Sequence, residues 1–152
     1  MKHPFQLKAV WNGGRNSEGH IEAGGLKSVI SIPQEMGGPG TGTNPDEMLL
    51  GAAATCYLIT LAAMLERSGI TPLELTLASE ATVDVTNNVF TYERIVHKPR
   101  IVLRAAAAAS ELEIAERLAH KAEQSCMISR AVAGNVSMET LPVVVTAEET
   151  GN

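Results

Sequence analysis

The chain has two cysteines, Cys56 and Cys126, and their positions are the first sign of chemistry. Cys56 lies within an uncharged run of residues, 48–65, and Cys126 ends an amphipathic helical pattern. Seventy positions separate the two, so only the fold can bring them together. In a chain whose start does not look secretory, two thiols contributed by two helices indicate redox chemistry rather than a structural disulfide.

A thiol within an apolar helix is ordinarily inert, because burial raises its pKa. Taken alone, Cys56 is therefore most simply interpreted as a small buried hydrophobic residue. To react, its sulfur needs a nearby cation that favours the thiolate. Arg15, which follows two glycines in an expected turn, is the candidate, since a guanidinium stays charged and can bind a carboxylate through two hydrogen bonds. The alternative for Arg15 is a solvated surface residue.

Asp46 or Glu47 could hold this arginine in place. Ten residues of helix span about 15 Å, so Asp46 cannot touch Cys56 of its own helix. It could instead meet Arg15 in the same chain, or approach the cysteine of a partner chain across a dimer interface. The alternative is that both acids only complement the dipole at the start of their helix.

The composition argues against several classes of function. The 152 residues are 45% hydrophobic and 19% charged, which predicts one globular domain over 1–152. Aromatic residues make up 3% and the net charge is −5, so we expect no nucleic-acid partner. The sequence lacks C-x-x-C and H-E-x-x-H spacings and the lysine of a phosphate-binding loop, so we expect neither a metal nor another cofactor.

Two segments of the sequence bear on where the protein is located. The N-terminal segment has no apolar core of the kind that marks a signal peptide, so we expect a cytoplasmic protein. The uncharged run 48–65 is at the lower limit for a membrane-spanning helix. Alanine, glycine and threonine dilute it, and Lys or Arg is not in excess on either flank. We therefore expect a core helix enclosed by sheets, and no membrane partner.

Periodicity and turn residues predict an α+β fold with mainly antiparallel sheets. The glycine- and proline-rich segment 33–45 is interpreted as a flexible flap. In chain order, the expected elements are strands at 5–11, 21–23 and 26–32, a helix from 45 to 68, strands at 73–85 and 89–103, a helix from 110 to 126 and a strand at 136–145. One all-apolar helix needs cover on every side, so we expect an obligate homodimer in which two central helices pack back to back.

Local signals mark the ends of these elements. Thr43 or Asn44 can cap the first helix, because both side chains carry an acceptor for the free N–H groups of a first turn. Ser110 with Glu113 is typical of a capping box at the start of the second helix. Pro99 indicates an edge or a bulge in its strand, because proline cannot donate a hydrogen bond to a neighbour.

Three segments in order resemble a known family: WNGGRNSEG, SIPQEMGGPGTGTNPDEMLLGAAATC and CMISRAVAGNVSM. They are similar to the OsmC/Ohr proteins and, more closely, to the branch of organic hydroperoxide resistance proteins. That branch has G-G-R near its start, a P-x-x-x-G-G loop, N-P-E-x-L ten residues before one cysteine, and C-P-x-S-x-A-x-x-G-N-V at the other. The resemblance covers the chain from about Trp11 to the last strand.

The resemblance implies an OsmC-like fold, with antiparallel sheets around a long central apolar helix, in an intertwined homodimer with its active site at the subunit interface. It implies a peroxiredoxin-like thiol peroxidase that reduces organic hydroperoxides to alcohols and protects against oxidative stress. Cys56 would be the peroxidatic cysteine, and Cys126 would resolve it as a redox-active disulfide. Arg15 would activate the thiolate, and Asp46 falls where the family usually has glutamate. An external dithiol, lipoyl-type or another thiol, would reduce the disulfide.

The sequence departs from the family pattern at two positions. Asp46 is one methylene shorter than the usual glutamate, and the neighbouring Glu47 could take over its role. Met127 replaces the usual proline after the second cysteine, which would loosen the geometry of the resolving thiol. The alternative function is a non-catalytic OsmC-like module that binds a small apolar ligand at the same interface.

Overall fold

The computed structural model describes residues 1–148, and the chain forms two compact units. The N-terminal unit comprises residues 1–48, and the C-terminal unit begins at residue 49. Helix α1 (Pro45–Arg67) has its first turn in the N-terminal unit and the rest of its length in the C-terminal unit. The expected single domain over 1–152 stays a prediction.

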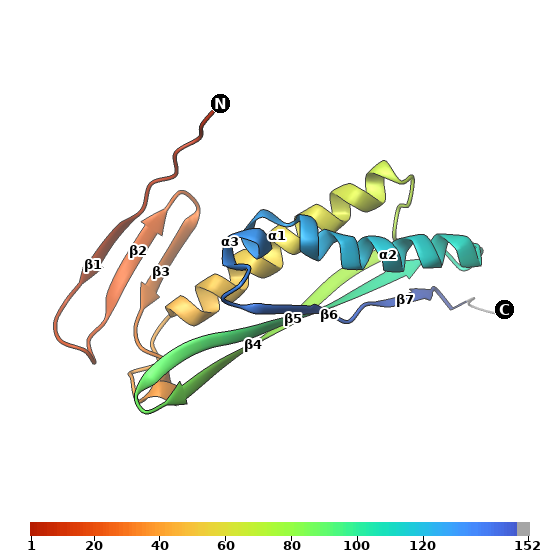
Figure 1. Cartoon of the computed structure of the whole chain (residues 1–152). Coiled ribbons are helices and arrows are strands. Elements are labelled where there is room, and N and C mark those ends of the chain that lie inside the picture. Colours follow the sequence, from red (N-terminus) through yellow and green to blue (C-terminus); the bar gives the residue numbers. More distant parts are fainter. Residues whose placement is uncertain (149–152) are drawn as a thin grey trace. The chain divides into compact units, whose positions relative to one another are not determined.

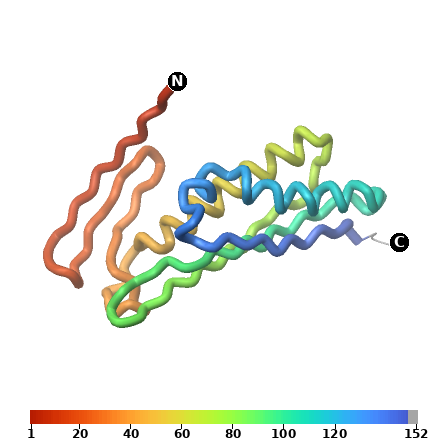
Figure 2. Tube along the Cα trace, viewed as in Figure 1, coloured from red at the N-terminus to blue at the C-terminus, as the bar shows by residue number. Residues whose placement is uncertain are grey.

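The N-terminal unit is a three-stranded antiparallel sheet of consecutive strands. Figure 2 shows the chain reversing between them. The indole N–H of Trp11 closes the first turn by donating to the Gly14 carbonyl over 2.9 Å. In the second turn Gly24 has a φ of 57°, a left-handed conformation that side chains disfavour. The three predicted strands are confirmed as β1 (Lys8–Trp11), β2 (Gly19–Ala23) and β3 (Leu26–Ile30).

The glycine- and proline-rich loop is tied to itself and to β3 by hydrogen bonds. It contains a short 3₁₀ turn, η1 (Gln34–Met36). The Ser31 hydroxyl donates to the Thr41 carbonyl and accepts the Thr41 N–H, each over 2.7 Å. The Thr43 N–H donates to a β3 carbonyl over 2.9 Å, and a Cβ added to Gly42 would lie 2.1 Å from the same oxygen. In place of the expected flexible flap, the structure therefore has a loop that packs tightly onto β3.

Helix α1 begins and ends where the sequence predicts. The side-chain oxygen of Asn44 accepts the N–H of Glu47 over 2.9 Å, so Asn44 caps the helix and Pro45 takes its first position. At the other end Gly69 has a φ of 72°, and the Ile70 N–H donates to a carbonyl of the last turn over 2.9 Å.

The C-terminal unit is built on a four-stranded sheet. Its strands are β4 (Glu74–Thr86), β5 (Val89–Leu103), β6 (Ser137–Thr140) and β7 (Val143–Thr146). β4 and β5 form the predicted antiparallel hairpin through Asn87 and Asn88, whose φ values are 52° and 61°. β6 and then β7 pair with the other side of β5 in parallel. The single last strand of the prediction is thus two strands, and its pairing is parallel because a helical crossover precedes it.

Pro99 lies in the central strand, so the expected edge position is wrong. The carbonyls of His97 and Leu103 accept N–H groups from the side of β6 and β7, over 2.8 and 2.7 Å. Backbone groups alternate along a strand, so Pro99 also faces that side. It falls after the pairing of β6 and before that of β7, where its missing N–H breaks no ladder. The bulge of this hairpin lies elsewhere, between Thr82 and Val83.

Helices α2 (Ala109–Ser125) and α3 (Met127–Val132) lie with α1 on one face of this sheet (Figure 1). The predicted apolar stripe of α2 is buried: Ala115, Leu118, Ala119, Ala122 and Cys126. The predicted capping box is wrong, because α2 begins at Ala109 and its N-cap position is Ala108, before Ser110. Ser110 is therefore the second helical residue and lies inside the first turn, where it cannot act as the N-cap.

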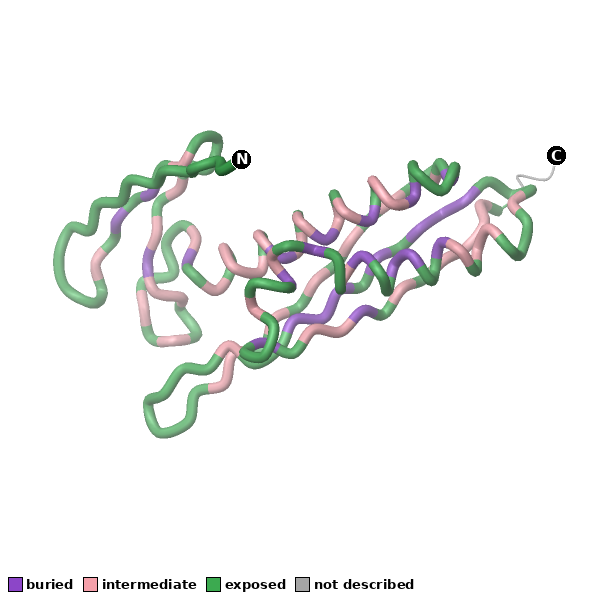
Figure 3. Tube along the Cα trace, turned by 45° about the horizontal axis from the view of Figure 1, so that its top comes forward, coloured by how far each residue is buried: buried purple, intermediate pink, exposed green. Residues whose placement is uncertain are grey.

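The main core cluster joins α1, α2 and β5. Helix α1 contributes to the core of the unit a narrow stripe with a spacing of four residues: Ala53, Tyr57, Leu61 and Leu65. The rest of its apolar surface is open or half-buried in one chain, as the mixed colours along α1 in Figure 3 show, and Ile59 is 70% exposed. One chain therefore does not enclose this helix on every side.

By length and composition alone, α1 could also cross a membrane. Its most apolar stretch of 18 residues has a mean hydropathy of 2.0, and 22% of that stretch is buried within the chain. Core helices of soluble proteins meet the same criterion, and the stripe that α1 buries against β5 and α2 is what a core helix has.

Candidate active site

The fold brings Cys56 and Cys126 into hydrogen-bond contact within the C-terminal unit. Cys56 lies midway along α1. Cys126 lies between α2 and α3, where a φ of −63° and a ψ of 127° end one helix and allow the next to start. Both are free thiols, and Cys126 is fully buried whereas Cys56 is partly exposed. The pair therefore has one sulfur open to solvent and one shielded from it.

The surroundings of Cys56 favour its thiolate. Burial raises the pKa of Cys56, but hydrogen bonds to the sulfur outweigh that effect and the pKa lies below its ordinary value. The donors are the thiol of Cys126, the backbone N–H groups of Ile128 and Met127, and the hydroxyl of Thr60. Each of these bonds is stronger to a charged sulfur than to a neutral one, so each favours loss of the proton.

The surroundings of Cys126 have the opposite effect. Burial raises the pKa of Cys126, and so does its hydrogen bond to Cys56, because a thiol that donates a proton to a neighbouring thiolate holds that proton more tightly. The backbone N–H of Ser129 offsets only part of this increase. When the pair loses its first proton, the charge is therefore favoured on Cys56 and the remaining proton on Cys126.

Three of the donors to Cys56 were not anticipated from the sequence. Thr60 follows Cys56 by four residues, one turn along the same helix, and this spacing could have identified it. The N–H groups of Met127 and Ile128 belong to the first turn of α3, where they have no acceptor inside their own helix. Backbone donors leave no mark in side-chain composition, so no sequence motif indicated them.

Next to Cys56, Tyr57 fixes this part of α1 to the rest of the unit. Its hydroxyl donates to the Ala119 carbonyl of α2 over 2.8 Å, and its ring stacks on His97 of β5 at 4.6 Å between centroids. His97 is itself bonded to the Ser79 hydroxyl over 2.6 Å through Nδ1. Burial lowers the pKa of His97 to about 4, so the ring is neutral at physiological pH. The turn that carries Cys56 is thus held from two sides.

Arg15 lies in the N-terminal unit, in the turn after β1. One guanidinium nitrogen donates to the side-chain oxygen of Asn16 over 2.8 Å, and another donates to the Met36 carbonyl over 3.0 Å. The bond to Met36 holds the guanidinium against the glycine- and proline-rich loop. Its approach to Cys56 stays a prediction.

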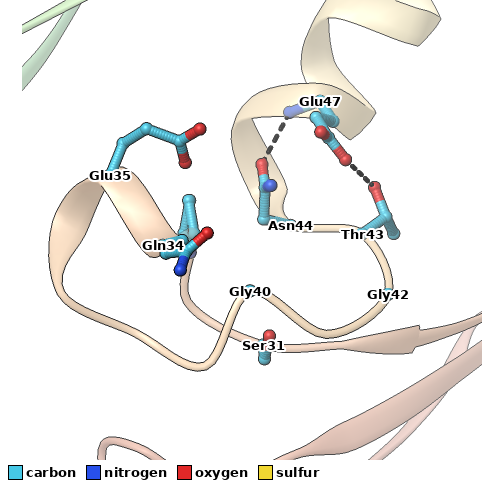
Figure 4. Close-up of a pocket in the computed structure, with 9 residues that line it drawn as sticks. Ser31, Gln34, Glu35, Gly40, Gly42, Thr43, Asn44 and Glu47 are labelled. Atoms are coloured by element: carbon cyan, nitrogen blue, oxygen red, sulfur yellow. Dashed lines mark hydrogen bonds between the residues drawn. The ribbon is translucent and has the colours of Figure 1, made fainter.

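Asp46 and Glu47 both lie in the first turn of α1. Glu47 accepts a hydrogen bond from the Thr43 hydroxyl over 2.9 Å, while its N–H donates to Asn44 (Figure 4). These two bonds give Glu47 a structural role in starting the helix. Which acid orients Arg15 stays a prediction.

A polar pocket of about 160 Å³ opens beside Glu47 within the N-terminal unit. Figure 4 shows side chains from the loop and from the start of α1 around it, including Ser31, Gln34, Glu35, Thr43, Asn44 and Glu47. Among residues 1–148, no three His, Cys, Asp or Glu side chains are grouped so as to hold a metal ion.

Comparisons with known proteins agree on the fold. The family model described as OsmC-like protein matches residues 38–141. The chain is 58% identical over 137 residues to the uncharacterized protein YmaD of Bacillus subtilis (strain 168), which covers 90% of this chain and 91% of that protein. It is 28% identical over 137 residues to an organic hydroperoxide resistance protein of Xanthomonas axonopodis pv. citri (strain 306), covering 88% of this chain and 91% of that one.

A solved structure extends the likeness to three dimensions. The crystal structure of an organic hydroperoxide resistance protein OsmC from Legionella pneumophila superimposes with a TM-score of 0.72 at 27% identity. The match covers 96% of this chain and 100% of that one. The α+β architecture expected from the sequence is thereby confirmed.

Proposed function

Because this chain belongs to the OsmC-like protein family, we propose that it is a cysteine-based peroxidase that reduces organic hydroperoxides to alcohols. The name of the Xanthomonas relative, organic hydroperoxide resistance protein, supports this substrate class. One observation carries the proposal: two thiols are in contact, and their pKa values move in opposite directions. A nucleophilic thiolate beside a protonated thiol is what a two-cysteine peroxidase needs before its substrate arrives.

In the first step the Cys56 thiolate attacks one oxygen of the hydroperoxide. A sulfur–oxygen bond forms and the oxygen–oxygen bond breaks, so that sulfur is oxidised to a sulfenic acid and the peroxide is reduced. The leaving alkoxide takes up a proton and departs as an alcohol. Partial exposure of Cys56 gives the substrate access to the sulfur that reacts.

In the second step Cys126 attacks the sulfenic sulfur of Cys56. A disulfide forms, the Cys126 proton joins the departing hydroxide, and water leaves. The hydrogen bond between the two sulfurs places the second thiol next to the first. An external dithiol, lipoyl-type or of another kind, then reduces the disulfide by exchange, returning both thiols and closing a disulfide of its own.

The proposal extends to residues of the N-terminal unit and to a second copy of the chain. In it, Arg15 binds the peroxide and favours the thiolate, and Asp46 or Glu47 orients the arginine. The exposed apolar surface of α1 supports a homodimer, since a second copy would remove that surface from water. We place this peroxidase in the cytoplasm, where it would protect against oxidative stress, with neither a nucleic-acid nor a membrane partner.

The test is peroxide consumption by the purified protein with an organic hydroperoxide and excess dithiothreitol. The wild-type chain should turn over many equivalents of peroxide, and Cys56→Ser should consume none. Turnover that survives in Cys56→Ser, or is absent from the wild-type chain, would rule out this mechanism.

A second candidate function is a module that binds a small apolar ligand without catalysis. It is favoured by an open cleft of about 400 Å³ in the C-terminal unit, lined by Ala62, Ala63, Ile70, Pro72 and Leu75 among others. Under this alternative the wild-type chain would not consume peroxide, and an apolar fluorescent probe would bind equally well to the wild-type chain and to Cys56→Ser.

A further inference from the structure

Three polar side chains form a row across the sheet of the C-terminal unit. Ser79 on β4 is the register partner of His97 on β5, and His97 is the register partner of Thr140 on β6. The Leu141 N–H donates to the His97 carbonyl over 2.8 Å, which fixes the end of β6 beside His97. On the helix side, the ring of Tyr57 stacks on the ring of His97 at 4.6 Å between centroids.

His97 and Thr140 both lie on the face of the sheet that the helices cover. Side chains alternate between the two faces along a strand, so residues two apart share a face. His97 follows Ile95 by two residues, and Thr140 follows Met138 by two, and Ile95 and Met138 pack together in the core. The exposed fractions of His97 and Thr140 are 0% and 9%. Two polar side chains are therefore buried next to each other.

The His97 ring has a hydrogen-bond partner on one side only. Its Nδ1 lies 2.6 Å from the Ser79 hydroxyl. Its Nε2, across the ring from Nδ1, has no hydrogen-bond partner in the described part of the chain, and neither has the Thr140 hydroxyl. Buried polar atoms in native proteins almost always have a partner, either from the protein or from ordered water.

The position of these two atoms fits a bridging water molecule. Neighbouring strands lie about 4.8 Å apart, and a water molecule with hydrogen bonds of about 2.8 Å spans such a separation. Burial lowers the pKa of His97 to about 4, so the ring is neutral and has one donor and one acceptor nitrogen. Because water donates and accepts, it can pair with Nε2 in either tautomer and with a hydroxyl. Helix α2, which packs against β6, buries Ala119 and Ala122, whose small side chains fill little space.

We propose that the C-terminal unit has a binding site for one buried water molecule, held between Nε2 of His97 and the hydroxyl of Thr140. With this water, a continuous chain of hydrogen bonds joins Ser79, His97 and Thr140 across three strands. The ring that it completes supports Tyr57, which directly follows Cys56. The site goes beyond the proposed function, since it involves no reaction and does not depend on whether the cysteines reduce peroxide.

A crystal structure of the wild-type chain, at a resolution that shows ordered water, tests the site directly. We expect one solvent oxygen within about 2.7–3.2 Å of both His97 Nε2 and Thr140 Oγ1. A direct hydrogen bond between these two side chains would overturn the inference. So would a site in which other side chains pack against both atoms and no solvent oxygen contacts them.

Relaxation dispersion of oxygen-17 water tests the site in solution, because it counts the water molecules that stay inside a protein for longer than it tumbles. Thr140→Val keeps the shape of the side chain and removes its hydroxyl, so this variant should hold one long-lived water fewer than the wild-type chain. Thr76→Val, at an exposed position on β4, is the matched control and should keep the wild-type count. Equal counts in the two variants would contradict the proposal.

Urea denaturation measures whether Thr140 acts through His97. Thr140→Val should raise the equilibrium constant for unfolding about tenfold, as expected for the loss of one buried hydrogen bond. In a His97→Phe background, where the bridge is already broken, the same substitution should raise it less than about threefold. Equal changes in the two backgrounds, whether large or small, would overturn the inference. The crystal structure and the water count need no substitution at position 97, so they decide the matter if His97→Phe does not fold.

Discussion

The two regions that hold the cysteines shift the pKa of a thiol in opposite directions. Cys56 lies in the middle of α1, and Cys126 lies at the junction of α2 with α3. At Cys56 the donors from α3, Thr60 and Cys126 outweigh burial, and the pKa falls. At Cys126 burial dominates, the neighbouring sulfur adds to it, and the pKa rises. The two pKa values diverge partly because the regions are in contact. The hydrogen bond between the sulfurs favours charge on Cys56 and keeps the proton on Cys126. The pKa of each cysteine therefore depends partly on a residue from outside its own helix.

The largest expected effect separates the two sulfurs by their roles. Cys126→Ser leaves the nucleophile in place but removes the resolving thiol, so we expect about one turnover per site before further peroxide oxidises Cys56 to sulfinic acid. Cys56→Ser should give no turnover. The measurements are the peroxide consumed per chain and the oxidation state of Cys56 by mass spectrometry. Equal residual activity in the two variants would show that the roles are not divided in this way.

The part of α1 that carries Cys56 also packs on a buried neutral ring, that of His97, through Tyr57. The pKa of His97 is about 4, lowered by burial from an ordinary value near 6.5. Above pH 6.5 the ring is neutral in both the folded and the unfolded chain, so it adds no pH dependence to the free energy of unfolding. As the pH falls from 6.5 to 4, only the unfolded chain takes up this proton, so the free energy of unfolding should fall by about 3 kcal/mol.

His97→Asn tests this pH dependence, since asparagine can keep the bond to Ser79. Urea denaturation between pH 7 and pH 4 should show a flatter dependence in this variant than in the wild-type chain. His120→Asn, at an exposed position on α2, is the control and should keep the wild-type slope. Parallel slopes in the wild-type chain and in His97→Asn would show that this ring does not control acid stability.

Arg15 would widen the difference between the two pKa values by placing a cation beside Cys56 alone. If it acts there, Arg15→Ala should slow the reaction with organic hydroperoxide roughly 100-fold, as the loss of one donor to developing charge does elsewhere. The exposed Arg67, in the last turn of α1, provides the control variant Arg67→Ala. Single-turnover kinetics in a Cys126→Ser background measure this directly. Rates that match in the two variants would make Arg15 a surface residue.

A smaller effect decides which acid orients the arginine. Glu47 already accepts from Thr43 and donates to Asn44, so its role in the helix start accounts for it. We expect Asp46→Asn to slow peroxide reduction roughly tenfold, about 1.4 kcal/mol of transition-state stabilisation, and Asp46→Glu to retain activity. Glu47→Gln should cost less activity than Asp46→Asn. The reverse order would move the role to Glu47.

The smallest effect concerns the hydroxyl one turn after Cys56. Thr60→Val keeps the shape of the side chain and removes its donor, so the pKa of Cys56 should rise by about half a unit. Thr55→Val is the control on the same helix, since that hydroxyl donates to the Gly51 carbonyl over 2.7 Å and does not reach the sulfur. Thiolate titration compares the two, and equal pKa values would remove Thr60 from the set of donors.

Elements with strong local signals were predictable from the sequence. The cap at Asn44, the turn at Asn87 and Asn88, and the end of α1 at Gly69 each follow from one or two residues that restrict the backbone. The expected cap at Ser110 failed because the helix starts one residue earlier, at Ala109, so that Ser110 lies inside the first turn. The parallel pairing of β6 and β7 was missed because it depends on contacts across the crossover, which no local pattern records.

The candidate site follows the same division. Cys56, Cys126, Arg15 and the two acids were identified from side-chain type and from resemblance. The N–H groups of Met127 and Ile128 were not, because any residue except proline carries one.

The crossover that returns α3 to α1 has a consequence for the protein as it is made. Cys56 leaves the ribosome before any of the donors of α3 exists, so the nascent chain carries a thiol of ordinary acidity and low reactivity. In the proposed mechanism, the raised reactivity of Cys56 towards peroxide begins only when the last third of the chain has folded back. During synthesis under oxidative stress, Cys56 would therefore gain its proposed reactivity only once Cys126, the thiol proposed to resolve it, is in place.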